Sequence, residues 1–304
     1  MRAIVTGGAG FIGSHVVDAL LVRGDEVAVV DSLVHGRREN VAQGAELHVR
    51  DIREPLEDLF DAVRPEVVFH LAAQADVRVS VEHPVMDAEV NVLGTVRIVE
   101  AARRHGSQVV FSSTGGAIYG ECSAPAPETT PCEPVSPYGT AKLAAEEYLR
   151  SYNRLHGTAH VALRYGNVYG PRQDPHGEAG VVAIFLGALE RGEQATIFGD
   201  GLQTRDYVYV GDVARATLSA VGHDGGVFNV GTGRETSVVD LYALCARVAG
   251  SDAQARHADA RLGELQRSFL DPELAARELG FRAMVDLEDG LGATWDWLRA
   301  DMKE

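Results

Sequence analysis

Cysteine is scarce in this chain, whose 304 residues include three of them, Cys122, Cys132 and Cys245. The number is odd, and the spacing fits neither a disulfide framework nor a CxxC metal pair. A pairing of Cys122 with Cys132 in a loop is the alternative, but free thiols in a reducing compartment are the simpler expectation. The sequence therefore predicts a cytoplasmic protein.

Long apolar runs are absent as well. No stretch approaches the roughly 18 apolar residues of a membrane-spanning helix. The opening residues, MRAIVTGG, lead straight into a predicted strand and carry no charged segment followed by an apolar one. We therefore expect neither a signal peptide nor a membrane partner.

Positive charge is in short supply. Lys and Arg total 28 against 44 Asp and Glu, which gives a formal net charge of -16. Such an acidic body repels phosphate backbones, so nucleic acid is not an expected partner. An anionic small ligand remains compatible with it if local arginines and backbone amides hold the anion. The histidines show no spacing typical of metal ligands, and we expect no metal site.

Short apolar runs alternate with helical patterns along the first half of the chain. The runs occupy residues 3–6, 27–31, 46–51, 66–73, 108–113 and 160–165. Apolar residues with helical spacing occupy 14–24, 85–106 and 136–157. Continuous apolar strands alternating with helices indicate a parallel sheet covered on both faces. We predict an α/β fold with a Rossmann-type, doubly wound parallel sheet.

The pattern becomes looser after about residue 167. A segment rich in proline and glycine covers 168–180, and a strand, a turn, a second strand and a helix are predicted within 196–221. We predict a domain of residues 1–167, to which part of 200–235 returns. Residues 168–304 are expected to form mainly a smaller C-terminal α/β domain that binds the substrate.

A glycine-rich turn lies between the first predicted strand and the first predicted helix. Gly7, Gly10 and Gly13 allow the backbone to approach a pyrophosphate and then enter a helix whose N-terminus faces that anion. Asp31 ends the second strand, where a carboxylate accepts hydrogen bonds from the adenosine ribose and repels a 2′-phosphate. The pattern favours NAD over NADP, although Arg37 and Arg38 argue weakly for NADP.

Tyr138 and Lys142 are four residues apart in a predicted helix and therefore share one face. Such a spacing is common on protein surfaces, and alone it does not indicate chemistry. A tyrosine hydroxyl has a pKa of ~10 and is a poor base at neutral pH. A nearby ammonium group favours the phenolate, so the pair is suited to proton transfer beside a dinucleotide.

Several motifs occur in a characteristic order. They are the three glycines at 7, 10 and 13, RDI at 50–52, HLAAQ at 70–74, Asn91, FSST at 111–114, Tyr138-x-x-x-Lys142 and RYGNVYGPR at 164–172. Together they resemble the extended short-chain dehydrogenase/reductase family, and the nearest likeness is to UDP-glucose 4-epimerases and related nucleotide-sugar epimerases. The resemblance extends from Met1 to about Trp297.

The resemblance implies a cofactor site for NAD. Its members would be Gly7, Gly10, Phe11, Ile12, Gly13, Asp31, Ser32, Leu33, Gly36, Asp51, Ile52, Leu71, Ala72, Ala73, Gln74, Asn91, Ser112, Tyr138, Lys142 and Tyr165. Asn91 has an alternative interpretation, in which it is a hydrogen-bonded core residue.

The resemblance also assigns the chemistry. Tyr138 would be the catalytic base, Lys142 its helper and Thr114 the hydroxyl that contacts the sugar. Ser113 is the alternative to Thr114, because this chain has one residue more than many epimerases before the following Tyr-Gly pair. Related dehydratases and decarboxylases carry carboxylates after this position. Gly115 and Gly116 stand here instead, which leaves epimerisation at C4 of the sugar.

Residues of the second half would hold the nucleotide sugar. The resemblance places Asn167, Gly180, Val181, Val182, Thr196, Phe198, Arg205, Arg261, Glu264 and Ser268 there, beside Thr114 and Tyr138. Arg205 and Arg261 would hold the pyrophosphate in bidentate fashion. Ser268 would stand beside the sugar as a gate, where a small residue admits N-acetylated sugars and a tyrosine restricts the cavity.

We therefore expect a UDP-hexose 4-epimerase that keeps NAD as a cofactor. UDP-glucose and UDP-galactose are the expected substrates, with N-acetylated forms beside them. The alternatives are a UDP-glucuronate 4-epimerase or another nucleotide-sugar epimerase, with UDP or dTDP, and a non-catalytic NAD-sensing regulator. In this family the helices at 85–106 and 136–157 pair with their copies, which implies a homodimer.

Overall fold

The computed structural model describes residues 1–174, 180–260 and 264–301. Its largest feature is a parallel sheet of seven strands, in the order β11-β6-β5-β4-β1-β2-β3. The strands are β1 (Arg2–Thr6), β2 (Glu26–Asp31), β3 (Glu46–Val49), β4 (Val67–His70), β5 (Gln108–Thr114), β6 (Val161–Tyr165) and β11 (Gly226–Val230). The order reverses between β1 and β4, as in a doubly wound sheet, so the predicted fold class is confirmed.

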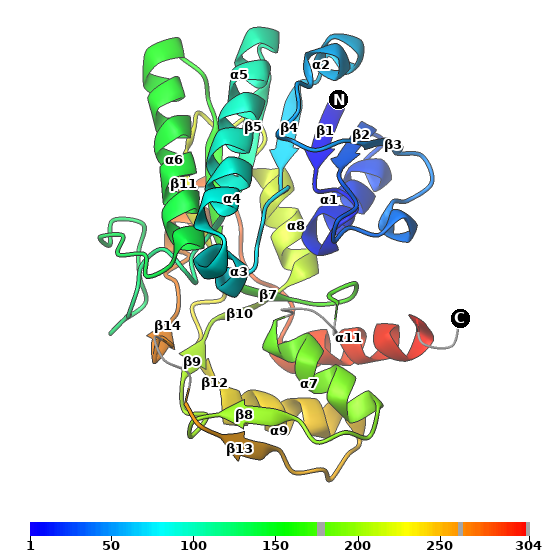
Figure 1. The fold of residues 1–304 in the computed structure, drawn as a ribbon, viewed down its shortest axis with the longest axis vertical. Helices are drawn as coiled ribbons and strands as arrows, with labels where there is room; N and C mark the ends of the chain where they lie inside the picture. Colours follow the sequence, from blue (N-terminus) through cyan, green and yellow to red (C-terminus); the bar gives the residue numbers. More distant parts are fainter. Residues whose placement is uncertain (175–179, 261–263, 302–304) are drawn as a thin grey trace.

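The two faces of the sheet bury alternate residues of each strand. Ala3 and Val5 of β1 pack against α1 (Phe11–Val22) and α8 (Val210–Ser219) on one face. Ile4 points to the other face, which is covered by α2 (Glu57–Val63), α5 (Thr95–His105) and α6 (Pro137–His156). Figure 1 shows both helical layers. Burial on two faces explains why the strands read as continuous apolar runs.

The remaining elements lie below the sheet in Figure 1. The strands there are β7 (Asn167–Tyr169), β8 (Thr196–Phe198), β9 (Thr204–Arg205), β10 (Tyr207–Tyr209), β12 (Thr236–Ser237), β13 (Arg256–Ala258) and β14 (Arg267–Ser268). The helices there are α7 (Val181–Glu190), α9 (Val238–Ala249) and α11 (Leu287–Asp301), whereas α10 (Glu273–Glu278) packs against β11 of the sheet. A separate apolar core joins α7, α9 and α11. The domain boundaries themselves stay a prediction.

The helical pattern at 85–106 forms three pieces rather than one regular helix. After α3 (Val77–Glu82) come α4 (Pro84–Ala88), a π-helical turn (Glu89–Gly94, η2) and then α5. A short 3₁₀ turn, η1 (Arg38–Asn40), is also present. Single π-helical turns inside helices are frequent at functional sites. Periodicity alone does not detect them, because the apolar pattern continues through the turn.

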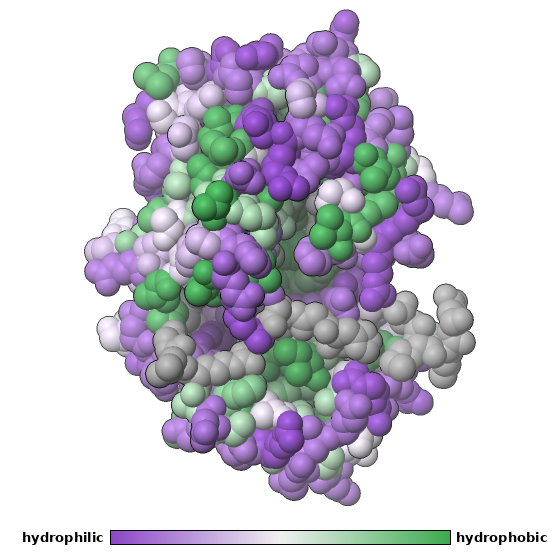
Figure 2. Space-filling model, in the orientation of Figure 1, coloured by the Kyte–Doolittle hydropathy of each residue, from purple (hydrophilic) through white to green (hydrophobic). Residues whose placement is uncertain are grey.

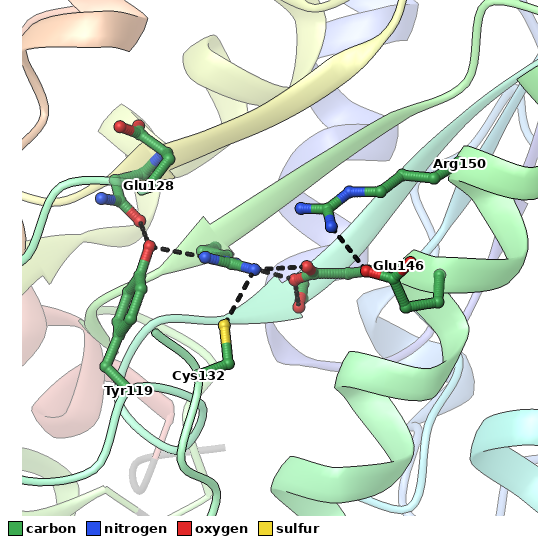
Figure 3. A network of polar contacts seen from close by, with 9 residues as sticks. Tyr119, Glu128, Cys132, Glu146 and Arg150 are labelled. Carbon is green, nitrogen blue, oxygen red and sulfur yellow. Dashed lines mark hydrogen bonds and ion pairs between the residues drawn. The ribbon is translucent and has the colours of Figure 1, made fainter. Parts of the chain in front are cut away.

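A buried ion pair ties the sheet to the loop after β5 (Figure 3). Arg164 of β6 and Glu146 of α6 are both fully buried, 2.6 Å apart. Arg164 also donates to the hydroxyl of Tyr119 at 2.7 Å and to the sulfur of Cys132 at 3.3 Å. Asn229 of β11 accepts from Tyr119 at 2.8 Å. The network therefore fixes the loop that follows the carboxyl end of β5.

The structure leaves Cys122, Cys132 and Cys245 as unpaired thiols. Within the described ranges, no helix combines the length and the apolar character needed to cross a membrane.

Candidate active site

A cavity of about 450 Å³ opens at the carboxyl ends of β1, β2, β4 and β5. This is the edge of a doubly wound sheet at which ligands bind, beside the reversal of strand order. It is lined by Gly7, Gly10, Phe11, Ile12, Gly13, Val30, Asp31, Ser32, Val34, His35, Gly36, Arg50, Asp51, Ile52, Arg53, Leu71, Ala72, Ala73, Gln74, Ala75, Asp76, Val79, Met86, Val90 and Ser112.

The glycine-rich turn forms one wall of this cavity because side chains do not fit in it. Gly7 has φ +72°, and a Cβ there would lie 2.7 Å from the backbone nitrogen of Ala72. A Cβ on Gly13 would overlap the carbonyl oxygen of Gly7. Gly10 caps α1 without a side-chain hydrogen bond. The first amides of α1 are therefore available to an anion such as a pyrophosphate.

Asp31 is buried at the end of β2 and already has two backbone partners. Its carboxylate accepts from the amide of Ala9 at 3.0 Å and from that of Leu33 at 2.8 Å. An ionised carboxylate has about four lone-pair positions, so it can also accept from two ribose hydroxyls. The glycine cradle, the uncapped helix and this carboxylate together fit the pyrophosphate and ribose of a dinucleotide.

Fifteen of the predicted cofactor residues line this cavity. The five others are Leu33, Asn91, Tyr138, Lys142 and Tyr165. Leu33 adopts a positive φ of 58° and holds Asp31 through its amide. Tyr138 and Tyr165 line a second cavity.

Sequence reasoning missed several lining residues, among them Val34, His35, Arg53 and Met86. They belong to no motif: Val34, His35 and Arg53 reach the cavity from loops, and Met86 reaches it from α4. Of these four, Arg53 alone left a signal in the sequence, since it directly follows RDI. In the structure it forms an ion pair with Asp51 at 2.7 Å.

A second cavity adjoins the first, and Phe11, Ile12 and Ser112 line both. Figure 2 shows the surface hollowed between the sheet and the elements below it. The second cavity is lined by Phe11, Ile12, Ser112, Ser113, Thr114, Tyr138, Tyr165, Gly166, Asn167, Val168, Tyr169, Gln173, Gly180, Val181, Val182 and Tyr207. A ligand in it would lie directly against the inner end of a bound dinucleotide.

Tyr138 is held at this junction by the start of α6. Ser136 caps the helix by accepting from the amide of Gly139 at 3.1 Å, and Pro137 occupies the first turn. A Cβ on Gly139 would overlap the carbonyl oxygen of Ala117. The glycine after Tyr138 therefore lets the helix pack directly against the loop that follows Thr114.

Lys142 is buried one helical turn further on. Its ammonium donates to the carbonyl of Ser112 at 2.8 Å and lies 5.9 Å from the centre of the Tyr138 ring. Burial lowers the pKa of Lys142 to about 8, and the carboxylates of Asp87 and Glu146 oppose this shift. The ammonium group is therefore poised to lose its charge close to physiological pH.

The protein alone raises the pKa of Tyr138 above its ordinary value. Desolvation is the main cause, and the negative charge of Asp87 adds to it. The expected lowering of this pKa combines the ammonium of Lys142 with the positive charge of a bound nicotinamide, and the protein alone supplies only the first. In the protein alone, proton removal from Tyr138 is therefore disfavoured.

Asn91 lies behind the cofactor cavity rather than in its lining. It is buried in the π-helical turn, accepts from the amide of Gln74 at 3.0 Å and donates to the Gln74 carbonyl at 2.8 Å. Its amide also donates to Asp87 at 2.9 Å. Asn91 therefore positions Gln74, which lines the cavity, as a hydrogen-bonded core residue would.

The structure separates the roles of Ser113 and Thr114. Ser113 is buried, and its hydroxyl donates to Glu146 at 2.6 Å. Thr114 ends β5, is only partly buried and lines the second cavity with Tyr138. The geometry supports Thr114 as the hydroxyl available to a ligand.

The two glycines after Thr114 differ in the room around them. A Cβ on Gly115 would lie 2.6 Å from the side chain of Leu270, so a larger residue would clash there. A Cβ on Gly116 would lie 3.5 Å from the side-chain oxygen of Asn167 and 4.0 Å from the hydroxyl of Thr114. No carboxylate stands at either position.

Half of the residues predicted for the substrate line the second cavity: Thr114, Tyr138, Asn167, Gly180, Val181 and Val182. Thr196 and Phe198 lie in β8, which pairs with β13. Arg205 and Glu264 form an ion pair at 3.7 Å, and Ser268 is buried beside Arg205 in β14. Arg261 lies outside the described residues.

A model of the NAD dependent epimerase/dehydratase family matches residues 3–231. The chain belongs to this family. It is 47% identical over 315 residues to a UDP-glucose 4-epimerase of Mycolicibacterium smegmatis, covering 98% of this chain and 99% of that protein.

Two solved structures of UDP-glucose 4-epimerases are also similar to this member of the epimerase/dehydratase family. The Thermotoga maritima protein, crystallised with UDP-glucose, has a TM-score of 0.97 at 48% identity, covering 99% of this chain and 100% of its own. The Thermus thermophilus protein, in complex with NAD, has a TM-score of 0.93 at 48% identity, covering 98% and 99%.

Two polar residues of this family member face the second cavity and were missed in the sequence. Both line that cavity, and among the described residues the side-chain oxygen of Gln173 and the hydroxyl of Tyr207 have no hydrogen-bond partner. Tyr207 follows Arg205 by two residues, which places both side chains on one side of an extended chain. That spacing is the only signal the sequence carried. Among the described residues, no group of three or more His, Cys, Asp or Glu side chains is placed to hold a metal ion.

Proposed function

We propose that this chain catalyses the NAD-dependent epimerisation of a UDP-hexose at C4, with UDP-glucose and UDP-galactose as the substrate pair. The observation that carries the proposal is the position of Tyr138, Lys142 and Thr114 where the dinucleotide cavity meets the second cavity. A sugar in the second cavity would have its reacting carbon between a base and a hydride acceptor. The names of the three similar proteins support the UDP-hexose.

NAD, held by the glycine-rich turn and Asp31, would supply the redox chemistry, a reversible hydride transfer at C4 of the sugar. The chain handles the proton and the geometry. Tyr138 takes the proton of the sugar 4-hydroxyl and gives it back in the return step. Thr114 donates a hydrogen bond that orients the same oxygen. Lys142 stabilises the phenolate of Tyr138 while its ammonium is charged.

Epimerisation requires no other acid or base near the sugar. Gly115 and Gly116 occupy the positions after Thr114, where elimination of water would need carboxylates. The proposed reaction therefore stops at inversion of C4.

We propose a homodimer through the helical segments 85–106 and 136–157, which form α4, η2, α5 and α6. Val85 and Leu93 are more than half exposed on these helices, and Tyr148 of α6 is 42% exposed. Exposed apolar side chains on neighbouring helices are suited to association with a second copy. Light scattering on the purified protein tests this, and a monomer at micromolar concentration would refute it.

The reaction is tested by incubating the protein with UDP-glucose, UDP-galactose, UDP-glucuronate and dTDP-glucose and identifying the products. We expect interconversion of the UDP-hexoses and a transient rise in nicotinamide absorbance on addition of substrate. Tyr138→Phe should abolish turnover and keep NAD bound. Tyr152→Phe, in the same helix but bonded to Glu100, is the matched control and should stay active. Turnover by Tyr138→Phe would refute the role of Tyr138 as the catalytic base.

A further inference from the structure

A continuous chain of hydrogen bonds crosses the core behind the cofactor cavity. His70, the last residue of β4, is fully buried between two threonine hydroxyls: Nδ1 lies 2.7 Å from Oγ1 of Thr6, and Nε2 lies 3.0 Å from Oγ1 of Thr95. Thr6 ends β1 and also accepts from the amide of Ala72 at 3.2 Å. Thr95 begins α5 and donates to the carbonyl of Asn91 at 2.7 Å. The chain therefore connects the wall of the cofactor cavity with the π-helical turn, and the proposed reaction does not use it.

The two ends of this chain fix the direction of every hydrogen bond in it. A carbonyl oxygen only accepts, so the single hydroxyl proton of Thr95 goes to Asn91. Thr95 then accepts from His70, which places the ring proton on Nε2 and leaves Nδ1 as an acceptor. Nδ1 accepts from the hydroxyl of Thr6, whose lone pair serves the amide of Ala72. Every member is satisfied when His70 is neutral, and burial, which lowers its pKa to about 3, keeps it so.

The chain supports one segment of the cavity wall, residues 71–74, at both ends. All four residues of this segment line the cofactor cavity. At one end the chain holds the amide of Ala72. At the other, Asn91 accepts from the amide of Gln74 at 3.0 Å and donates to its carbonyl at 2.8 Å. His70 lies between the two supports and is linked to each of them through one threonine.

The supported segment meets the glycine-rich turn at close range. A Cβ on Gly7 would lie 2.7 Å from the backbone nitrogen of Ala72, so the two backbones leave no room for a side chain between them. Thr6 directly precedes Gly7, and its hydrogen bond to Ala72 therefore sets how far the wall stands from the turn. Groups that bind a ligand have to be held within about 0.5 Å of the productive geometry, which requires support from residues behind them.

We propose that His70 is a positioning residue for NAD, which holds residues 71–74 against the glycine-rich turn without touching the cofactor itself. The inference rests on the part of the proposed function that places NAD in the first cavity, and it is independent of the sugar. His70 acts through its two hydrogen bonds, one accepted and one donated. A side chain of similar size that makes neither bond should fill the same space and still hold the cofactor less well.

The test follows the rate at which bound NAD exchanges for labelled NAD in the purified protein. His70→Phe keeps an aromatic ring and removes both ring nitrogens, and it should speed NAD release about tenfold, the scale seen when a partner that supports a binding group is lost. His70→Gln can still donate and accept, and it should restore release to within about threefold of the wild type. UDP affinity, measured by calorimetry with NAD in excess, should stay unchanged in both variants, because no member of the chain lines the second cavity.

His160→Phe is the matched control. His160 is also buried, accepts from the amide of Val109 at 3.0 Å through Nδ1, and has a pKa that burial lowers to about 4. It lies at the amino ends of β5 and β6, whereas the cofactor cavity opens at the carboxyl ends of the strands. Its replacement should lower the melting temperature, as that of His70 does, and leave NAD release unchanged. Thr95→Val removes the next link of the chain and should also speed NAD release, which keeps the test available if His70→Phe does not fold.

The possible outcomes are separable. Release at the wild-type rate from His70→Phe, or from Thr95→Val in its place, would show a purely structural role and overturn the inference. Equally fast release from His160→Phe would trace the effect to general loss of stability and overturn it as well. Release from His70→Gln as fast as from His70→Phe would contradict the role of the hydrogen bonds. A wild type that holds no NAD would overturn both proposals, whereas a wild type that holds NAD but leaves UDP-hexoses unchanged would overturn the proposed reaction alone.

Discussion

The hydroxyl of Ser113 points into the protein core and donates to the carboxylate of Glu146 at 2.6 Å, whereas the neighbouring Thr114 lines the second cavity. Adjacent residues of a strand point to opposite faces, so one of the two hydroxyls had to turn inward. Glu146 also binds the buried Arg164, and this ion pair holds Glu146 where it accepts from Ser113, so Ser113 is the residue that turns inward.

Removing each of the two hydroxyls in turn should show that Thr114 contributes to activity and Ser113 to stability. Thr114→Val should lower kcat about 100-fold, as expected when one positioned hydrogen-bond donor is lost at a reacting oxygen, and should leave the melting temperature nearly unchanged. Ser113→Ala should leave kcat within a few fold and cost about 1–3 kcal/mol, because Glu146 loses a buried partner. A larger loss of kcat in Ser113→Ala than in Thr114→Val would reverse the assignment.

The sugar that fits should depend on Ser268, which is buried in β14 beside Arg205. We predict that the wild type accepts UDP-GlcNAc as well as UDP-glucose. Ser268→Tyr should restrict the cavity and lose most activity on UDP-GlcNAc while it keeps activity on UDP-glucose. Steady-state assays with both sugars check this. Rejection of UDP-GlcNAc by the wild type, or its equal acceptance by the variant, would refute the gate.

The alkaline limit of activity should follow the charge of Lys142. Burial lowers the pKa of Lys142 to about 8, and the negative charges of Asp87 and Glu146 limit this decrease. Activity should therefore fall above that pH, as the ammonium loses its proton. Asp87→Asn removes one of the two carboxylates, which should lower this pKa and move the alkaline limb of kcat to lower pH. Glu89→Gln, an exposed acid two residues away, should not move it. An unmoved limb in Asp87→Asn would contradict the role of Asp87.

Acid should unfold the protein partly through His70. Its side chain is fully buried between the hydroxyls of Thr6 and Thr95, and burial lowers its pKa to about 3 from an ordinary 6.5. Between these values the unfolded chain binds a proton that the folded chain does not, so stability is lost as the pH falls from 6.5. The slope should reach about 1.4 kcal/mol per pH unit.

The measurement for His70 compares unfolding free energies between pH 7 and pH 4 in the wild type and in His70→Asn. The variant should be less stable throughout but should show a shallower loss toward acid. His160, whose pKa burial lowers to about 4, should behave in the same way when replaced by Gln. Parallel curves for the variants and the wild type would exclude these histidines as the cause.

The loop after β7 should help to retain the cofactor. Arg172 forms an ion pair with Asp18 of α1 at 2.7 Å, and the carbonyl of Pro171 contacts His15 of the same helix at 3.0 Å. These contacts hold the loop against the middle of α1, whose N-terminus is the end at which the pyrophosphate is expected. Arg172→Ala should therefore speed NAD release severalfold, the scale of a partly exposed ion pair.

Release is followed as the NAD that stays with the protein through repeated gel filtration. Asp18→Asn breaks the same ion pair from the other side and should give the same loss. Arg2→Ala, which breaks a pair with Glu66 at the opposite end of the sheet, is the control and should retain NAD. Full retention by both Arg172→Ala and Asp18→Asn would show that the loop does not hold the cofactor.

The sheet and the glycine-rich turn could be predicted because each depends on local patterns. Apolar runs marked β1 to β6, and Gly7, Gly10 and Gly13 marked the turn that approaches Ala72. Strand β11 was not recognised, since Gly226 and Asn229 interrupt its short apolar pattern. Its place at the sheet edge is set by long-range pairing with β6, which no local pattern encodes.

The candidate site, too, could be predicted where its residues belong to local motifs and not elsewhere. Tyr138, Lys142 and Thr114 stood in ordered motifs, whereas Tyr207 and Gln173 stand out because their polar atoms lack a partner among the described residues. A missing hydrogen bond is a property of three-dimensional packing, so no spacing in the chain reveals it. The raised pKa of Tyr138 in the protein alone is likewise not encoded in the motif, because the cost of burial depends on everything around the hydroxyl.

The position of β11 also governs when the molecule can fold during synthesis. β11 pairs with β6 across about 60 intervening residues, which include β7 to β10 and the helices α7 and α8. A nascent chain that ends before Val230 exposes β6 as an open strand edge, a site prone to pairing with other chains. Truncation at residue 167 should therefore yield an aggregating fragment rather than a minimal dinucleotide-binding unit. The ribosome has to synthesise about three quarters of the chain before β11 can complete the sheet.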